Sequence, residues 1–304
     1  MTPDEHTNQE LTIEVGHGHR LYVQDWGLAT AKVVIIFLHG GPGGASKDKY
    51  KTGFDPQKQR VIFFDQRGSG QSTPSGSLQH NTTAELVEDI STIADQLGLD
   101  QFWLHGNSWG STLALAYALA HPKRAAGLAI GGIFTGSKSE TAWIDKGQFQ
   151  NFYPDVWQAY LQRTPKEHRH DPSAYHFDKI LNGNAQEQKL SGYAYDMLES
   201  GVVALDDGPR KTDFDDYDPA GIRIEIHYLA NGCFMPEEHI LQKAHQLTMP
   251  VFIVQGRYDM VCPPITAYRL HEAIKGSQLY WTQSGHRVEH EGQNLFKAIL
   301  AQVG

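Results

Sequence analysis

The segment Gly106-Asn107-Ser108-Trp109-Gly110 constrains the fold of this chain more than any other feature of its sequence. It follows residues 102–105, which predict a short strand, and precedes residues 111–120, an apolar run that predicts a buried helix. A strand, a G-x-S-x-G turn and a helix in succession are typical of a nucleophile elbow, which exposes a serine hydroxyl on a strained turn. The helix N-terminus behind Ser108 favours negative charge developing in front of it. The pattern therefore predicts Ser108 as a nucleophile, and a Gly/Ser loop formed by chance is the alternative.

Length and composition narrow the class of protein. The 304 residues suit one large α/β domain with an insertion, or two domains. The formal net charge is −9 without a block of Lys or Arg, so we expect no nucleic-acid partner. No apolar run approaches the roughly 20 residues of a membrane span, and the polar, acidic start is unlike a secretory signal. Cys233 and Cys262 are too few for a disulfide framework, so we expect a cytoplasmic protein without membrane association.

Alternating strand and helix patterns predict an α/β fold with a mostly parallel sheet flanked by helices. Residues 11–25 alternate between apolar and polar and predict an antiparallel hairpin. A helix is expected from Thr82 or Thr83 to Leu97, ended by Gly98, and a last helix from about 288 to 303. Continuous apolar runs typical of buried strands occupy residues 33–38, 61–64, 127–130 and 251–254, and residues 278–281 predict a further strand.

The composition and the hydrophobic pattern change between about Thr135 and Glu238. This segment is rich in Asp, His, Tyr and Gln and lacks long apolar strand runs. We interpret it as an inserted, mainly helical cap over residues 136–239. The core domain is then built from residues 1–135 and 240–304. A second independent domain is the alternative for a chain of this length.

Two loops near the C-terminus offer an acid and a base for Ser108. A serine nucleophile needs both, and after such an elbow they follow in the order serine, acid, histidine. Asp259 lies in the loop directly after the predicted strand 251–254, and His286 follows the last predicted strand. An ordinary turn aspartate is the alternative for Asp259. His290, inside the start of the last helix, is the nearest competitor for His286.

The loop after the first buried strand supplies half of a candidate oxyanion hole. Residues 39–44 read His-Gly-Gly-Pro-Gly-Gly, and glycine lets a backbone approach a substrate closely and adopt positive φ. An oxyanion hole needs a preorganised pair of N–H groups. We expect one from Trp109, directly after the nucleophile, and the other from Gly41.

Four motifs together resemble the proline iminopeptidases, which are serine peptidases of the α/β-hydrolase fold. The resemblance runs over nearly the whole chain and implies the release of N-terminal proline from peptides, without a metal or cofactor. It also implies Ser108 as nucleophile, Asp259 as orienting acid and His286 as base, in agreement with the assignment from the residues. The four motifs are HGGPG at residues 39–43, DQRGSGQS at 65–72, GNSWGS at 106–111 and GRYDMVCPP at 256–264.

The resemblance also implies substrate-binding residues in the cap. Two cap glutamates of the family hold the protonated N-terminus, and they match Glu199 and Glu225 here, while Phe134 matches an aromatic that lines the proline ring pocket. Both tryptophans of the Trp-x-x-Trp-Glu pattern that precedes the first glutamate are replaced, by Tyr195 and Leu198. We therefore expect altered pocket walls, with other small N-terminal residues as candidates beside proline.

The alternative for each glutamate is a solvated helix face, since glutamate is mostly exposed. Residues 222–228 moreover alternate as a strand would, whereas the resemblance implies a helix, and we follow the resemblance. Asn107 is a smaller departure, because glycine is common at that position in the family.

Three functions compete at this stage. The first is a peptidase that takes small peptides with a free N-terminus. The second is an esterase, lactonase or amidase with the same triad, because function depends on the site and not the fold. The third is a hydrolase-fold protein that only binds a ligand. No close His/Asp/Glu cluster has metal-ligand spacing, so we expect no metal site, and the sequence leaves the oligomeric state open.

Overall fold

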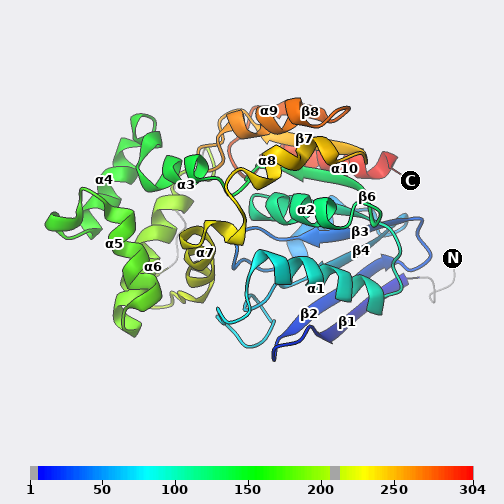
Figure 1. Ribbon diagram of the computed structural model, residues 1–304, viewed down its shortest axis with the longest axis horizontal. Coiled ribbons are helices and arrows are strands. Elements are labelled where there is room, and N and C mark those ends of the chain that lie inside the picture. Colours follow the sequence, from blue (N-terminus) through cyan, green and yellow to red (C-terminus); the bar gives the residue numbers. More distant parts are fainter. Residues whose placement is uncertain (1–5, 206–212, 304) are drawn as a thin grey trace.

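A computed structural model describes residues 6–205 and 213–303 and contains one sheet with the strand order β1-β2-β4-β3-β5-β6-β7-β8 (Figure 1). β1 pairs with β2 and β2 with β4 in antiparallel fashion, and every other neighbouring pair is parallel. The mostly parallel sheet and the N-terminal hairpin expected from the sequence are therefore confirmed. The strands are β1 (His6–Glu14), β2 (Arg20–Leu28), β3 (Val33–Leu38), β4 (Gln59–Phe64), β5 (Phe102–Asn107), β6 (Ala125–Gly131), β7 (Val251–Gly256) and β8 (Gln278–Thr282).

Helices cover both faces of the sheet because successive strand residues point to opposite sides. In β3, Ile36 and Leu38 join a cluster with α1, α2 and α9, whereas Ile35 and Phe37 join a second cluster with α10. Both faces are apolar, as expected for a parallel sheet buried on two sides. These helices are α1 (Thr83–Gln96), α2 (Trp109–Ala120), α9 (Pro264–Ala273) and α10 (Glu289–Gln302).

Local signals explain where α1 begins and ends. Thr82 is the N-cap, and its hydroxyl accepts a hydrogen bond from the Glu85 N–H. Gly98 follows the last turn at φ 65°, a conformation that glycine adopts without strain. The predicted helix bounds are confirmed.

The described residues between β6 and β7 are helical or irregular, and they contain no strand. Figure 1 shows α3 to α6 at one end of the molecule, away from the sheet, and α7 beside the core. Helices α3 to α7, which we call the cap, contribute to one apolar cluster that includes Phe149, Tyr160 and Tyr195. The helices between β6 and β7 are α3 (Lys138–Asp145), α4 (Pro154–Arg163), α5 (Pro172–Asn182), α6 (Ala185–Ser200), α7 (Ala220–Ala230) and α8 (His239–Lys243), and Ile240 of α8 packs into the core instead.

Residues 222–228 lie in helix α7, as the resemblance implies, and not in a strand. Their alternating pattern has a physical cause. Ile224 and Tyr228, four residues apart, belong to the core cluster that also contains α1 and α2. Ile222 and Ile226, also four residues apart, belong to the cap cluster. A helix buried on two faces therefore produces an alternation that resembles a strand.

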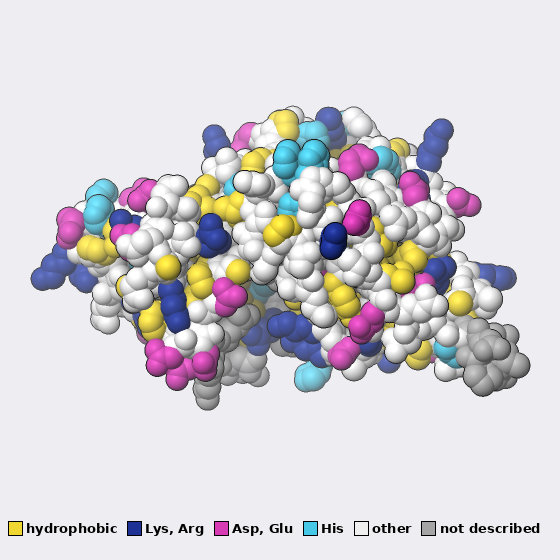
Figure 2. Space-filling model, turned by 90° about the horizontal axis from the view of Figure 1, so that it is seen from below, with side chains coloured by type: hydrophobic (Ala, Val, Ile, Leu, Met, Phe, Trp, Pro, Cys, Tyr) yellow, Lys and Arg dark blue, Asp and Glu magenta, His cyan; other side chains and the backbone are white. Residues whose placement is uncertain are grey.

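Figure 2 shows one face of the molecule with its side chains coloured by type. On the face shown in Figure 2, Lys and Arg side chains are interspersed with Asp and Glu side chains. Among the described helices, none is long and apolar enough to cross a membrane.

Candidate active site

Ser108 lies between β5 and α2 on a strained turn. Its backbone has φ 60° and ψ −130°, which is uncommon for a residue with a side chain. The flanking glycines are sterically required, since a β-carbon on Gly106 would lie 2.6 Å from the carbonyl carbon of Gly110. A β-carbon on Gly110 would collide with the Leu38 carbonyl oxygen of β3. The turn thus has the backbone of a nucleophile elbow.

Asp259 and His286 come together from the loops after β7 and β8. His286 Nδ1 lies 2.9 Å from Asp259 Oδ2. Asp259 Oδ1 accepts hydrogen bonds from the backbone N–H groups of Val261, at 2.9 Å, and Cys262, at 2.7 Å. An ionised carboxylate only accepts, so the imidazole proton belongs on Nδ1 and Nε2 is left as the acceptor. His290 lies in α10, as expected.

The nucleophile strand contacts both of these loops. The Ser108 hydroxyl is hydrogen-bonded to the Cys262 thiol, whose pKa is raised well above its usual value by burial. Asn107 Nδ2 donates to the His286 carbonyl oxygen at 3.1 Å. The serine, the acid and the histidine predicted from the sequence thus lie on three loops in mutual contact.

The glycine-rich loop after β3 lies against the elbow. A β-carbon on Gly40 would lie 3.6 Å from Ser108 Cβ, and Gly41 has φ 116°, which favours glycine. Trp109 is the first residue of α2, so its N–H has no acceptor within the helix. Its buried ring is held by a 2.8 Å bond from Nε1 to Gln66 Oε1, and Gln66 Nε2 donates to the His39 carbonyl oxygen at 3.0 Å. The loop and the elbow are therefore fixed relative to each other.

Comparison with known proteins places the chain in a family. Residues 33–290 match the alpha/beta hydrolase fold family. A probable proline iminopeptidase of Leptolyngbya boryana is 38% identical over 90% of this chain and 87% of its own length. The chain belongs to the proline iminopeptidase family. A proline iminopeptidase structure from Mycobacterium smegmatis has a TM-score of 0.60 at 21% identity, with 97% of both chains covered.

The fold alone does not distinguish proline iminopeptidases from other hydrolases. An esterase structure from Exiguobacterium antarcticum has a TM-score of 0.62 at 20% identity, and the match covers 97% of this chain and 99% of that one. What separates the two classes must therefore lie in the site and the cap.

The two cap glutamates expected from this family meet between helices. Glu199 is in the last turn of α6 and Glu225 in the middle of α7, and their carboxyl groups are hydrogen-bonded to each other. Burial and the Glu199 charge raise the pKa of Glu225 well above its usual value. The Glu199 carboxylate also lies close enough to Cys262 to raise the pKa of that thiol. The Glu199 charge therefore acts on a residue that contacts Ser108.

A third carboxyl group in this cluster was missed from the sequence. Asp145 ends α3, and its Oδ1 accepts a 3.1 Å hydrogen bond from the Tyr195 hydroxyl. Burial raises the pKa of Asp145 to about 7, and the Glu199 charge adds to the shift. Tyr195 stands where the family pattern has its first tryptophan, so this departure provides the partner of Asp145.

Phe134 lies directly beyond β6, beside the helix that follows Ser108. Its N–H donates to Ser111 Oγ at 3.2 Å, and its carbonyl oxygen accepts from Thr112 Oγ1 at 2.7 Å. Ser111 Oγ in turn donates to the Ser108 carbonyl oxygen at 2.7 Å. Two hydrogen bonds thus join the backbone of Phe134 to the first turn of α2, and Ser111 joins that turn to Ser108.

The cap also holds the acid and base loops, which the sequence did not reveal. Trp143 Nε1, in α3, donates to the Met260 carbonyl oxygen at 2.7 Å. The His286 N–H donates to the Val203 carbonyl oxygen at 2.9 Å. Each contact joins residues more than 80 positions apart, so no local pattern could predict it.

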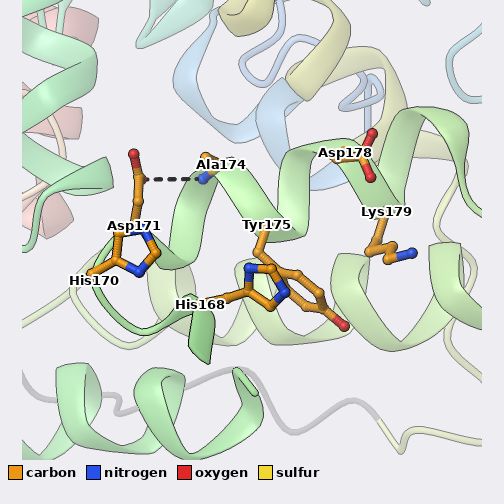
Figure 3. A pocket seen from close by; sticks show the side chains of 7 residues that line it. All are labelled: His168, His170, Asp171, Ala174, Tyr175, Asp178 and Lys179. Carbon is orange, nitrogen blue, oxygen red and sulfur yellow. Dashed lines mark hydrogen bonds between the residues drawn. The ribbon is translucent and has the colours of Figure 1, made fainter. Parts of the chain in front are cut away.

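A surface pocket on the cap contains none of the predicted site residues (Figure 3). It lies over the start of α5, where Asp171 accepts from the Ala174 N–H and pairs with Lys146 at 2.8 Å. The ring of His168 stacks on Tyr175. These contacts are local to an exposed part of the cap.

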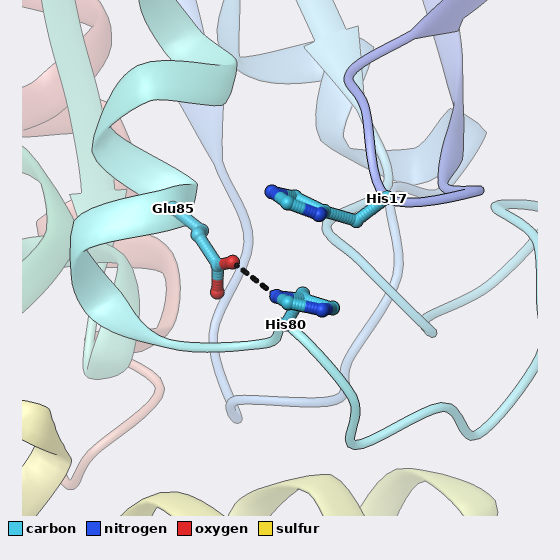
Figure 4. Close-up of side chains that lie close together, drawn as sticks. All are labelled: His17, His80 and Glu85. Carbon is cyan, nitrogen blue, oxygen red and sulfur yellow. Dashed lines mark hydrogen bonds and ion pairs between the residues drawn. The ribbon is translucent and has the colours of Figure 1, made fainter.

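One group of metal-ligating side chains lies at the turn between β1 and β2 and the start of α1 (Figure 4). His80 Nδ1 lies 3.2 Å from Glu85 Oε1, and the His17 ring stacks on His80 at 3.9 Å with an angle of 10° between the planes. The lone pair of each imidazole lies in the plane of its ring. Because the two planes are nearly parallel, the two lone pairs do not point at one ion. The carboxylate also faces Arg67, 3.8 Å away.

Proposed function

We propose that this protein is a serine aminopeptidase that releases proline, and other small residues, from the N-terminus of peptides. The observation that carries the proposal is the hydrogen-bonded pair Glu199–Glu225, close to a strained serine and an Asp259–His286 pair. A buried ammonium group needs carboxylates around it, because an unpaired buried charge is costly. An esterase has no such requirement.

The chemistry follows the roles that these groups can fill. Ser108 Oγ attacks the first peptide carbonyl while His286 Nε2 takes its proton, and Asp259 stabilises the resulting imidazolium. The N–H groups of Gly41 and Trp109 hold the oxyanion. His286 then protonates the leaving amine, and water hydrolyses the acyl-enzyme by the same steps in reverse.

Recognition of the substrate falls to the cap and the loop after β6. Glu199 and Glu225 bind the N-terminal ammonium, and Phe134 packs against the proline ring. The hydrogen bond between the two glutamates requires that one of them carry a proton in the free protein, because two carboxylates are both acceptors. The arriving ammonium favours the charged form of that group, so the proton leaves as the substrate binds.

The test compares four substrates with the wild type and Ser108→Ala. These are proline-aminomethylcoumarin, its N-acetylated form, alanine-aminomethylcoumarin and a p-nitrophenyl ester. We expect Ser108-dependent cleavage of the free-amine substrates, fastest for proline, and no cleavage of the acetylated one. Efficient ester turnover without an amine requirement would instead support a general esterase. Failure of an active-serine probe to label Ser108 would support a ligand-binding protein.

A second pair of variants tests the cap. Glu225→Gln should raise KM for proline-aminomethylcoumarin by at least about tenfold, because a charge-assisted contact to the ammonium is lost. Glu167→Gln, on the exposed cap surface, is the matched control and should leave KM unchanged. Equal KM values for both variants would remove the glutamate pair from the proposal.

A further inference from the structure

Gln255 is a fully buried glutamine at the end of β7, next to the acid loop. It follows four apolar residues of that strand and shares the sheet face of Ile253, which packs into the apolar core. Burying an amide is unfavourable unless its hydrogen bonds are replaced. An apolar residue would fill this space equally well. The hydrogen bonds of Gln255 therefore indicate why a glutamine stands here.

Every hydrogen of the Gln255 amide is used. Its Nε2 donates to Asp259 Oδ2 and to the Cys262 carbonyl oxygen, both at 3.1 Å. Its Oε1 accepts from the Ile133 N–H at 2.9 Å. The flipped amide would set its NH2 against that N–H and its oxygen against two acceptors, so only one orientation is possible.

We infer that Gln255 is a positioning residue for the triad, acting through Asp259. Oδ1 of Asp259 is held by two backbone N–H groups, whereas Oδ2 receives His286 Nδ1 and, from the rest of the described chain, Gln255 Nε2. Without Gln255, that oxygen would be held only by the histidine that it must orient. A carboxylate anchored only at Oδ1 can still pivot about that oxygen, and it then orients the imidazole less strictly.

The same amide connects the acid to the nucleophile. Ile133, whose N–H it accepts, directly precedes Phe134, and the Phe134 N–H bonds Ser111 Oγ. Ser111 Oγ bonds the Ser108 carbonyl oxygen. Gln255 therefore joins the acid loop to the loop that is attached to the elbow.

The inference rests on the proposed triad, and the test separates it from the proposed substrate. Two readouts are measured for each variant: kcat and KM on proline-aminomethylcoumarin, and the rate at which a fluorophosphonate labels Ser108. The labelling rate reports the reactivity of the triad whatever the natural substrate is. If the wild type is labelled quickly but does not cleave the prolyl substrate, the proposed aminopeptidase activity is refuted. The positioning role of Gln255 is then still decided by the labelling rates of its variants.

Gln255→Leu removes the donor at nearly the same volume. We expect kcat and the labelling rate to fall on the order of 10- to 100-fold, with KM within about twofold of the wild type. Gln59→Leu is the matched control. Gln59 is also buried, and among the described residues its side chain bonds the Leu300 carbonyl oxygen and the Asp55 N–H at the start of β4, whereas the triad residues follow the ends of their strands. It should lose thermal stability without losing kcat.

Gln255→Glu gives a second, independent signature. A carboxyl group at this position donates to Asp259 only while it is protonated. The pH profile of kcat should therefore show a decrease at alkaline pH that the wild-type profile lacks. A wild-type labelling rate in folded Gln255→Leu would overturn the inference. Should that variant not fold, a wild-type pH profile in Gln255→Glu would overturn it instead.

Discussion

At the scale of single residues, Asp259 is held so firmly that its replacement has a defined outcome. In Asp259→Asn, the two N–H groups of Val261 and Cys262 still require the oxygen at the Oδ1 position. The amide NH2 then faces His286 Nδ1, which must become an acceptor and move its proton to Nε2. That tautomer cannot accept the Ser108 proton, so we expect kcat to fall on the order of 10⁴-fold.

The measurement is kcat together with the thermal midpoint of unfolding. The midpoint should decrease only modestly, because the Gln255 Nε2 donor loses its acceptor when it faces the new amide NH2, whereas the other contacts of the side chain are kept. Asp178→Asn, on the exposed side of α5, is the control for the substitution itself and should not change kcat. A fall of less than about tenfold in Asp259→Asn would speak for another acid.

Asn107 is a second residue with a testable connection. Its Nδ2 donates to the His286 carbonyl oxygen, whereas its buried Oδ1 has no hydrogen-bond partner in the described part of the chain. Asn107→Ala should reduce kcat roughly 3- to 10-fold and stability by about 1 kcal/mol, since one bond to the base loop is lost. Kinetics and urea unfolding check this. If stability is lost but kcat is unchanged, Asn107 has a structural role and does not position His286.

These residues mark the limit of what the sequence could predict. Ser108, Asp259 and His286 could be proposed from the sequence because each follows a predicted strand, and position after a strand is a local signal. The side-chain contacts of Asn107 and Asp145 depend on residues 179 and 50 positions away. No periodicity or motif encodes a contact of that kind, and a single sequence leaves it invisible.

At the scale of elements, apolar runs predicted the central strands well because a strand buried on both faces is continuous in hydrophobicity. Helix α7 was harder, since its burial on two faces alternates like a strand. Only the family resemblance identified it as a helix. The same double burial places Glu225 between the cap and the core, so the proposed ammonium site depends on α7.

Ile226 tests that dependence. It is fully buried in the cap cluster and adjoins Glu225. Ile226→Ala should lower the free energy of unfolding by about 2–5 kcal/mol and raise KM more than it lowers kcat, because the cavity loosens the helix that carries Glu225. Ile265→Ala, at a side chain that is 61% exposed on α9, is the control. If Ile226→Ala is clearly destabilised but its KM is unchanged, the packing of α7 does not control substrate binding.

At the scale of the whole molecule, the cap and the sheet are joined at the edge where the parallel strands end. Trp143 and Val203 of the helical segment bond the acid and base loops of the core. Cap residues therefore contribute both to the carboxyl cluster and to the backbone around the triad. Stability and substrate binding should accordingly respond together to the charge of that cluster.

Asp145 makes this response measurable as a dependence of stability on pH. Its pKa rises from an ordinary value of 3.8 to about 7 on folding, so between these values the folded protein binds a proton that the unfolded chain does not. The free energy of unfolding therefore decreases as pH rises through this window, and becomes independent of Asp145 above it. Two pH units within the window correspond to a loss of up to about 3 kcal/mol.

Asp145→Asn should remove that loss, because the amide does not titrate and its oxygen still accepts the bond from Tyr195. Urea unfolding of both proteins at pH 5 and pH 8 gives the comparison. The Asp145 charge also adds to the raised pKa of the buried Glu225, so the difference between the two proteins reports Asp145 together with its effect on Glu225, and both contributions have the same sign. We expect the variant to gain stability relative to the wild type at pH 8 but not at pH 5. An equal difference at both pH values would mean that Asp145 is already ionised at pH 5 in the folded protein.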